Sequence, residues 1–210
     1  MKFLRAILLM IMLLLPLSAC GLSGSSVSGN VLEEGTNKPI EDAIVVLRWK
    51  GYVSAIVDAH TVCVHVESAT TDKRGNYKVS GWSKPSTMGP VFDVKPVVSA
   101  YKLGYGLPSN PAQKDEDVYL APFKGAREER LKYLERIARS GGCHAAGESE
   151  KNLYPLYEAL YFEAKVNAAK IEDLQWYREV AAAIAVGISD EFTHAENKKR
   201  IEQFLRGHLK

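Results

Sequence analysis

The apolar residues of this chain change their spacing near Pro122, and this change constrains the fold more than any other feature. Before it, short β-branched runs are separated by turn residues, which is typical of strands in an all-β sandwich. After it, apolar residues recur every third or fourth position, which is typical of amphipathic helices. We therefore predict an α+β chain: an antiparallel β-sandwich over 29–122, with a helical region over 123–210 packed against it.

The strands are predicted from β-branched and aromatic runs between clusters of turn residues. Two runs, 61–71 and 77–80, flank the turn Asp72-Lys73-Arg74-Gly75, in which Asp can bond its own backbone and Gly accepts positive φ. We expect these two runs to form a hairpin. The other strands are expected at 27–32, 43–50, 91–101 and 118–120.

Stripes of Leu, Ile, Val and Ala predict three or four helices in the second part of the chain. They are expected at 125–139, from the capping residue Asn152 onward, at 172–186 and from Ser189 to Lys210. The second of these helices places tyrosines beside its leucine stripe. Its apolar face is therefore wide enough to need cover from the sandwich as well as from other helices.

The first nineteen residues have the parts of a secretory signal. Lys2 and Arg5 form a positive start, an apolar run covers 6–15, and small residues precede Cys20. The apolar run is shorter than the ~20 residues that a helix needs to cross a bilayer core. We predict that residues 1–19 are a cleaved signal peptide.

The end of this signal, Leu17-Ser18-Ala19-Cys20, resembles the bacterial lipobox. The resemblance implies that Cys20 carries acyl chains, becomes the mature N-terminus and anchors the chain to a membrane. Because Gly21 stands where Asp would favour retention in the inner membrane, it also implies an outer-membrane location facing the periplasm. The alternative is an ordinary cleaved signal with an incidental Cys. Residues 20–28 are rich in Gly and Ser and are predicted to be a flexible tether.

The charge balance argues against a nucleic-acid partner. The whole chain has 27 Lys and Arg against 25 Asp and Glu, so loss of Lys2 and Arg5 with the signal leaves 25 of each sign. A neutral mature chain without a basic run lacks the electrostatic footprint of a nucleic-acid binder.

Several motifs of the first part occur in the order and spacing of a known family. They are Val31, Lys38-Pro39-Ile40, Ala43-Ile44-Val45-Val46-Leu47, Thr71-Asp72-Lys73-Arg74-Gly75-Asn76-Tyr77 and Gly104-Tyr105. This ordered set resembles the carboxypeptidase-regulatory-like, transthyretin-like sandwich. The family usually has Gly at the position of Asp42, so we expect that turn to differ in detail. The resemblance implies an accessory module without a catalytic centre.

The run from His60 to Glu67 holds the most reactive residues of the sandwich. Strand alternation predicts Val62, Val64 and Val66 on the core face, and therefore Cys63, His65 and Glu67 on the outer face. In an oxidising compartment, Cys63 is expected to pair with Cys143 in a disulfide. In the loop-entropy model, a closure of this length stabilises the fold by about 4 kcal/mol.

Two alternatives to the disulfide remain open at this point. Cys63, His65, Cys143 and His144 could form a Cys2His2 metal site, because Cys63 and His65 lie within reach of one ion along a strand. The other alternative is two unpaired thiols. Neither a cofactor nor any other metal is indicated by the sequence.

Common catalytic motifs are absent from the sequence: it contains no Gly-x-Ser-x-Gly, no His-Glu-x-x-His and no Walker-type loop. The single Glu191-Phe192-Thr193-His194 run lacks the second copy that a di-iron bundle needs. The loop around Trp82 and Lys84 is the candidate contact surface. We therefore expect an envelope lipoprotein that binds a protein or glycan partner without catalysis, with a periplasmic metal-binding protein as the alternative.

Overall fold

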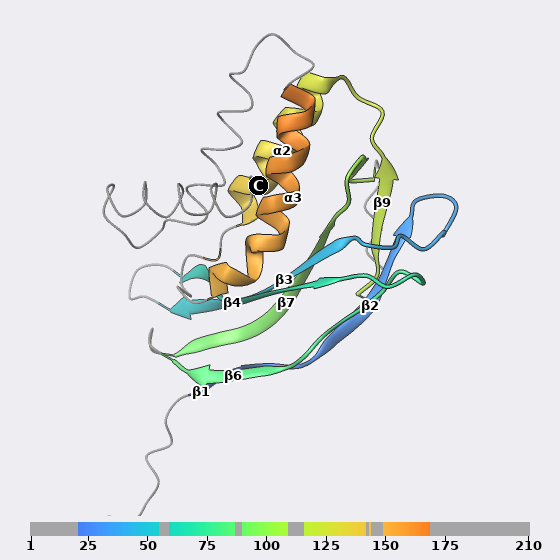
Figure 1. Cartoon of the computed structure of the whole chain (residues 1–210). Helices are drawn as coiled ribbons and strands as arrows, with labels where there is room; N and C mark the ends of the chain where they lie inside the picture. Colours follow the sequence, from blue (N-terminus) through green and yellow to red (C-terminus); the bar gives the residue numbers. More distant parts are fainter. Residues whose placement is uncertain are drawn as a thin grey trace, which may run out of the picture.

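The computed structural model describes residues 21–54, 59–86, 90–108, 116–141, 143 and 149–168. Its strands precede its helices, as the α+β prediction requires (Figure 1). The elements are β1 (Gly21–Gly24), β2 (Val27–Glu33), β3 (Ile44–Ser54), β4 (Ala59–Thr70), β5 (Asn76–Val79), β6 (Trp82–Pro85), β7 (Val91–Tyr101), β8 (Tyr105–Gly106), β9 (Val118–Pro122), α2 (Arg127–Gly141), the 3-10 helix η1 (Ser149–Leu153) and α3 (Tyr154–Ala168).

The strands form two larger sheets and a two-stranded ribbon. One sheet has the order β4-β3-β7 and is antiparallel, and the ribbon pairs β1 with β6. The other sheet has the order β5-β2-β9-β8. In it β2 and β9 run parallel, so this sheet is mixed where the sequence predicted an antiparallel one. Long connections separate these two strands in the chain, and such connections permit parallel pairing.

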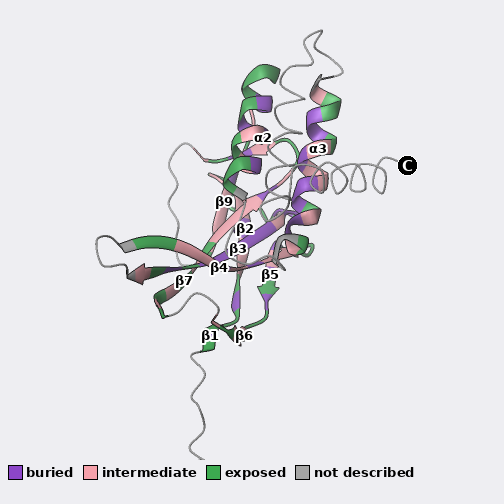
Figure 2. Cartoon of the chain, turned by 90° about the vertical axis from the view of Figure 1, so that its left-hand side faces the viewer, coloured by how far each residue is buried: buried purple, intermediate pink, exposed green. Residues whose placement is uncertain are grey.

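The central strand β3 is buried on both faces from Val45 to Trp49. Val45, Leu47 and Trp49 point into the core shared by the two sheets, where they meet residues such as Val31 and Leu120. The alternate residues of β3 point to the helices instead. The sheet β4-β3-β7 therefore lies between two hydrophobic cores (Figure 2).

The second core lies between this sheet and the helices. Leu131 and Leu134 of α2 and Leu156 and Leu160 of α3 are buried in it, together with Val46 of β3. The structure thus places both described helices on the sandwich, on the outer face of one sheet (Figure 1). The apolar stripes of the two sequence-predicted helices mark the buried faces correctly.

The predicted hairpin between 61–71 and 77–80 does not form. β4 pairs with β3, whereas β5 pairs with β2 in the other sheet. The turn Asp72-Lys73-Arg74-Gly75 therefore carries the chain from one sheet to the other. The turn itself has the expected conformation. The carboxylate of Asp72 accepts a hydrogen bond from the backbone N–H of Arg74, and Gly75 has φ +73°.

The predicted tether over 20–28 is wrong from Gly21 onward. Residues Gly21–Gly24 form β1, and Leu22 is buried in the sandwich core. Position 24 needs glycine because two tryptophan rings lie close to its backbone, not because the segment is flexible. A Cβ there would lie 2.3 Å from Nε1 of Trp82 and 2.5 Å from Nε1 of Trp49.

Asn152 was predicted to cap the second helix, but α3 begins later, at Tyr154. Asn152 lies in η1 and docks this segment on β4. Its Nδ2 donates to the carbonyl of Val66 at 3.1 Å, and its own carbonyl accepts from the hydroxyl of Ser68. The two predicted helices at 172–186 and from Ser189 to Lys210 lie outside the described residues.

A buried ion pair joins the two helices to the sheets. Arg130 of α2 donates through Nε and Nη2 to the carboxylate of Glu163 on α3, both at 2.8 Å. Tyr101 of β7 donates to the same carboxylate at 2.5 Å, and Arg130 also donates to the carbonyl of Tyr105. Burial and the charge of Glu163 raise the pKa of Tyr101, so its hydroxyl stays protonated as a donor.

Within the described residues, no helix is long and apolar enough to cross a membrane.

We predict that Arg130→Met alone destabilises the full chain by about 3–5 kcal/mol, because it leaves the buried charge of Glu163 without its partner. Adding Glu163→Leu should restore much of this loss, since the second change removes the stranded charge. Urea unfolding at neutral pH measures both effects.

The matched control for this pair is Arg139→Met. Arg139 and Glu135 form an i,i+4 pair in which the Arg139 side chain is 61% exposed. Its loss should cost no more than about 0.5 kcal/mol. Equal losses from Arg130→Met and Arg139→Met would contradict the role given to the buried pair.

Candidate functional site

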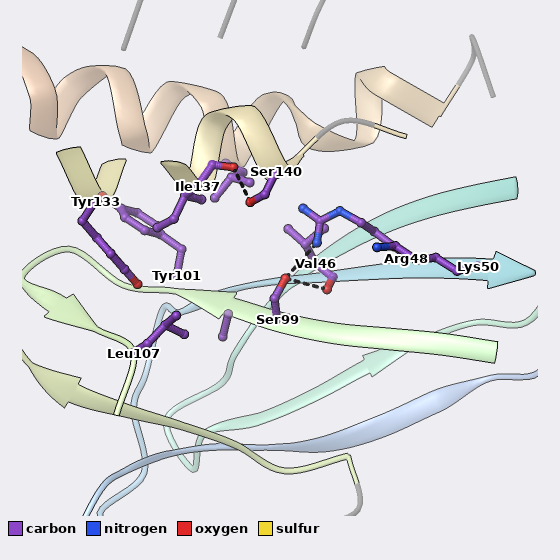
Figure 3. Close-up of a pocket in the computed structure, with 11 residues that line it drawn as sticks. Val46, Arg48, Lys50, Ser99, Tyr101, Leu107, Tyr133, Ile137 and Ser140 are labelled. Atoms are coloured by element: carbon purple, nitrogen blue, oxygen red, sulfur yellow. Dashed lines mark hydrogen bonds between the residues drawn. The ribbon is translucent and has the colours of Figure 1, made fainter. Parts of the chain in front are cut away.

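A cavity of about 230 Å³ lies between the β3–β7 part of the sheet and the helices (Figure 3). Strands supply its polar floor, and α2 and α3 supply much of its apolar wall. The lining residues are Val46, Arg48, Lys50, Ser99, Ala100, Tyr101, Leu107, Tyr133, Ile137, Ser140 and Leu156.

Arg48 provides a desolvated cation in this cavity. Strand alternation places it on the same face as Val46, so its side chain enters the helix-facing layer, where the residue is only 7% exposed. Its Nη1 donates to the hydroxyl of Ser99 at 3.0 Å, and Ser99 donates onward to the carbonyl of Val46 at 3.4 Å. Burial lowers the pKa of Arg48, and Tyr157 opposes this shift, but a guanidinium remains charged in proteins.

Lys50 extends this cationic lining to the exposed part of β3. It lies two residues beyond Arg48, on the same face of the strand, and it is exposed where Arg48 is buried. Opposite the two cations, Tyr133 and Ile137 of α2 form an apolar wall (Figure 3). A cavity with this lining suits a small group that carries negative charge and an apolar part.

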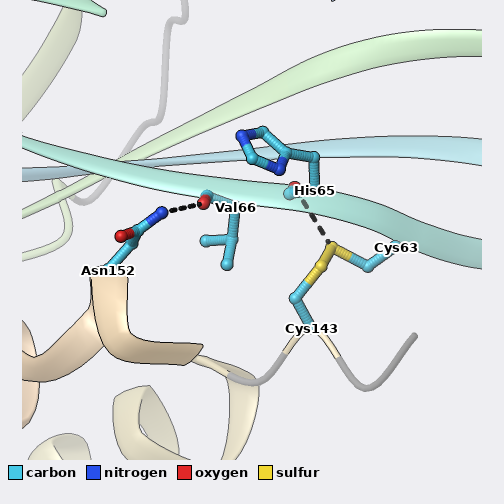
Figure 4. The surroundings of a disulfide bond; sticks show 5 residues. All are labelled: Cys63, His65, Val66, Cys143 and Asn152. Carbon is cyan, nitrogen blue, oxygen red and sulfur yellow. Dashed lines mark hydrogen bonds between the residues drawn. A yellow bond between two sulfur atoms is a disulfide. The ribbon is translucent and has the colours of Figure 1, made fainter. Parts of the chain in front are cut away.

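The predicted outer row of Cys63, His65 and Glu67 is wrong, because β4 contains a β-bulge. Trp49 pairs with His65 and Lys50 pairs with Cys63, so Val64 is an extra residue in β4. The bulge reverses the alternation after Val64. Cys63 faces the helices, whereas His65 points to the opposite face of β4, toward the tryptophans of the sandwich (Figure 4). Glu67, which pairs with the core residue Leu47, shares this face with His65.

His65 packs against the indole rings of two tryptophans in the sandwich interior. Its ring centroid lies 5.4 Å from that of Trp49 and 4.4 Å from that of Trp82. Its Nε2 lies 3.0 Å from a carboxylate oxygen of Glu67. Burial lowers the pKa of His65; Glu67 opposes the shift and Lys84 adds to it.

Cys63 and Cys143 are joined by a disulfide across 80 residues, with Cα atoms 5.1 Å apart (Figure 4). It fastens the segment between α2 and η1 to β4. Neither sulfur is then a free thiolate, and His65 points to the opposite face of β4. The structure therefore does not assemble the alternative metal set of Cys63, His65, Cys143 and His144, of which His144 lies outside the described residues. The described part of the chain contains no cluster of three or more potential metal ligands.

Trp82 and Lys84 were predicted to lie in a contact loop, but they belong to β6. Trp82 packs edge-on against Trp49 with ring centroids 5.8 Å apart, and Lys84 Nζ lies 5.8 Å from the Trp82 ring centroid. The indole N–H groups of Trp49 and Trp82 have no hydrogen-bond partner among the described residues. This segment is therefore part of the sandwich interior and its edge. Cys20, the predicted lipidation site, lies outside the described residues.

Three buried charged residues belong to no motif, but each stands at a position where the strand or helix pattern of the sequence predicts an apolar side chain. Arg48 occupies a position that alternates with Ile44 and Val46, which marks a charged residue on a buried strand face. Arg130 and Glu163 likewise interrupt the apolar stripes of α2 and α3. A charge at such a position indicates either a buried ion pair or a cavity.

No protein-family model matches the sequence, and no curated protein matches it. Among solved structures, the chain is similar to a 9R-lipoxygenase from Cyanothece PCC8801, with 12% sequence identity over 76% of this chain and a TM-score of 0.23. The chain spans 26% of that lipoxygenase chain. A TM-score this low assigns neither a fold nor a function.

We predict that the fold loses stability when the pH falls below the ordinary pKa of histidine, about 6.5. Because burial lowers the pKa of His65 in the folded chain, the unfolded chain binds more protons between the two pKa values. The free energy of unfolding therefore rises with pH through this window. The stability that the neutral His65 contributes is lost as the pH falls through it.

Urea unfolding of wild type and His65→Gln at about pH 7.5 and about pH 5.5 measures this contribution, since only the wild type titrates at position 65. The loss of stability on acidification should be smaller in the variant. The same loss in both chains would show that other groups carry the acid sensitivity.

Proposed function

We propose that this chain is a lipid-anchored protein of the bacterial envelope that binds a protein or glycan partner without catalysis. One observation carries the binding role: the cavity combines the buried cation Arg48 with the exposed cation Lys50 and an apolar wall. Such a site recognises a carboxylate or phosphate attached to an apolar body. We infer that the partner presents a group of this kind.

The anchoring role rests on the N-terminal sequence. A signal of residues 1–19 would leave Cys20 as the first mature residue, with acyl chains that hold the body in the outer membrane facing the periplasm. The first described strand begins directly after it, at Gly21. The anchor and the folded body would then be adjacent.

We also infer that the sandwich is of the carboxypeptidase-regulatory-like, transthyretin-like type. Three residues of the motifs that carry this resemblance lie at turns or strand starts. Pro39 forms a bridge with Leu32 after the β2 strand, Gly75 lies in a left-handed turn, and Tyr105 begins β8. An accessory module of this kind agrees with binding rather than catalysis.

Native mass spectrometry of the protein extracted in detergent from bacterial membranes tests the anchor and the disulfide together. We expect a chain that begins at Cys20, carries the mass of acyl groups and is two hydrogens lighter than the reduced form. A chain that retains residues 1–19, or one that lacks acyl mass, would contradict the anchor. Bound metal with both thiols reduced would favour the alternative function.

Cross-linking in intact cells, followed by purification, tests the binding site. We expect Lys50→Glu to reduce the recovered partner by about tenfold, since one lost charge-assisted contact is worth roughly 1.5 kcal/mol. The matched control is Lys38→Glu, an exposed Lys of the loop after β2 that does not line the cavity. Equal recovery with both variants would exclude this cavity as the partner site.

A further inference from the structure

Beyond the cavity, the helix-facing side of the sheet continues as an exposed surface that we call the tip face. It consists of two cross-strand pairs of β3 and β7. In one pair Lys50 lies opposite Lys95, and in the other Tyr52 lies opposite Phe92. The register shifts between the two pairs, where Asp93 has φ +52°, and this irregularity keeps Phe92 opposite Tyr52.

The tip face has a composition that is unfavourable for a surface exposed only to water. Phe92 is 55% exposed and Tyr52 is 49% exposed, so two large rings adjoin in solvent. Lysines directly opposite each other on a sheet repel. Lys95 forms an ion pair with Asp93 at 2.9 Å, and this pair is itself exposed. A surface that combines exposed rings with adjacent cations is suited to an anionic amphiphilic partner.

The tip face and the start of β1 lie at the same end of the sandwich, on opposite faces of the sheet β4-β3-β7. β1 begins at Gly21, one residue after Cys20, and it contacts β7. Leu22 is buried in the core against which Val91 and Val94, the neighbours of Phe92 in β7, also pack. Figure 1 shows β1 and β6 beside the first part of β7.

We propose that the tip face docks on the phospholipid surface that holds the acyl chains of Cys20. Phe92 and Tyr52 would enter the interfacial layer, where aromatic rings are favoured, and Lys50 and Lys95 would meet lipid phosphates. The absence of a spacer between Cys20 and β1 favours this occupant, because the anchor keeps the body within contact distance of the bilayer. This inference rests on the proposed lipid anchor.

Quenching of tryptophan fluorescence by brominated lipids tests the docking. The full acylated chain is reconstituted in vesicles whose phosphatidylcholine carries bromine on its acyl chains, with and without phosphatidylglycerol. Phe92→Trp places a reporter on the tip face, and the wild-type signal is subtracted to remove the native tryptophans. We expect the added emission to fall about twofold relative to unbrominated vesicles, and to fall further with phosphatidylglycerol.

The matched control is Phe162→Trp on α3, since Phe162 is 62% exposed but lies outside the tip face. Its added emission should not change. Equal quenching of the two reporters, or none at position 92, would overturn the docking even when the chain is acylated and floats with the vesicles. A chain that carries no acyl groups and does not float would instead contradict the proposed function. Far-ultraviolet circular dichroism of each variant shows that both are folded.

Discussion

The arrangement of the two described layers depends on the buried ion pair of Arg130 and Glu163. Its two parallel hydrogen bonds fix α2 against α3, while Tyr101 and the carbonyl of Tyr105 tie the same charges to β7 and β8. A bidentate pair is directional, so it sets the orientation of the helices as well as their proximity. The ion pair and the disulfide hold the helical layer to the sheet at separate points, and the cavity lies between the sheet and the helices.

The β-bulge of β4 places the reactive side chains of this strand on two different faces. One extra residue sends Cys63 to the helices, where it closes the disulfide, and sends His65 to the tryptophans of the sandwich. Without the bulge, both side chains would share a face, and the metal set would be geometrically plausible. A local irregularity of the backbone thus decides between two chemistries that the sequence alone leaves open.

The proposed roles share one end of the molecule. Lys50 lines the cavity and also belongs to the tip face, and β1, which begins at Gly21, contacts β7 of the same sandwich. If the tip face rests on the membrane, the cationic cavity opens close to the lipid surface. A partner would then be captured near the membrane rather than at the end of a flexible tether.

The sequence by itself determined the α+β order, most strand positions, the buried stripes of α2 and α3 and the pairing partner expected for Cys63, because these follow from local periodicity and from the few cysteines present. It did not determine that β5 leaves β4 for the other sheet, that Gly21–Gly24 pairs with β6, or that Arg130 meets Glu163. Those contacts join residues far apart in the chain. Only tertiary packing decides them, since local propensity is the same whichever distant strand or charge becomes the partner.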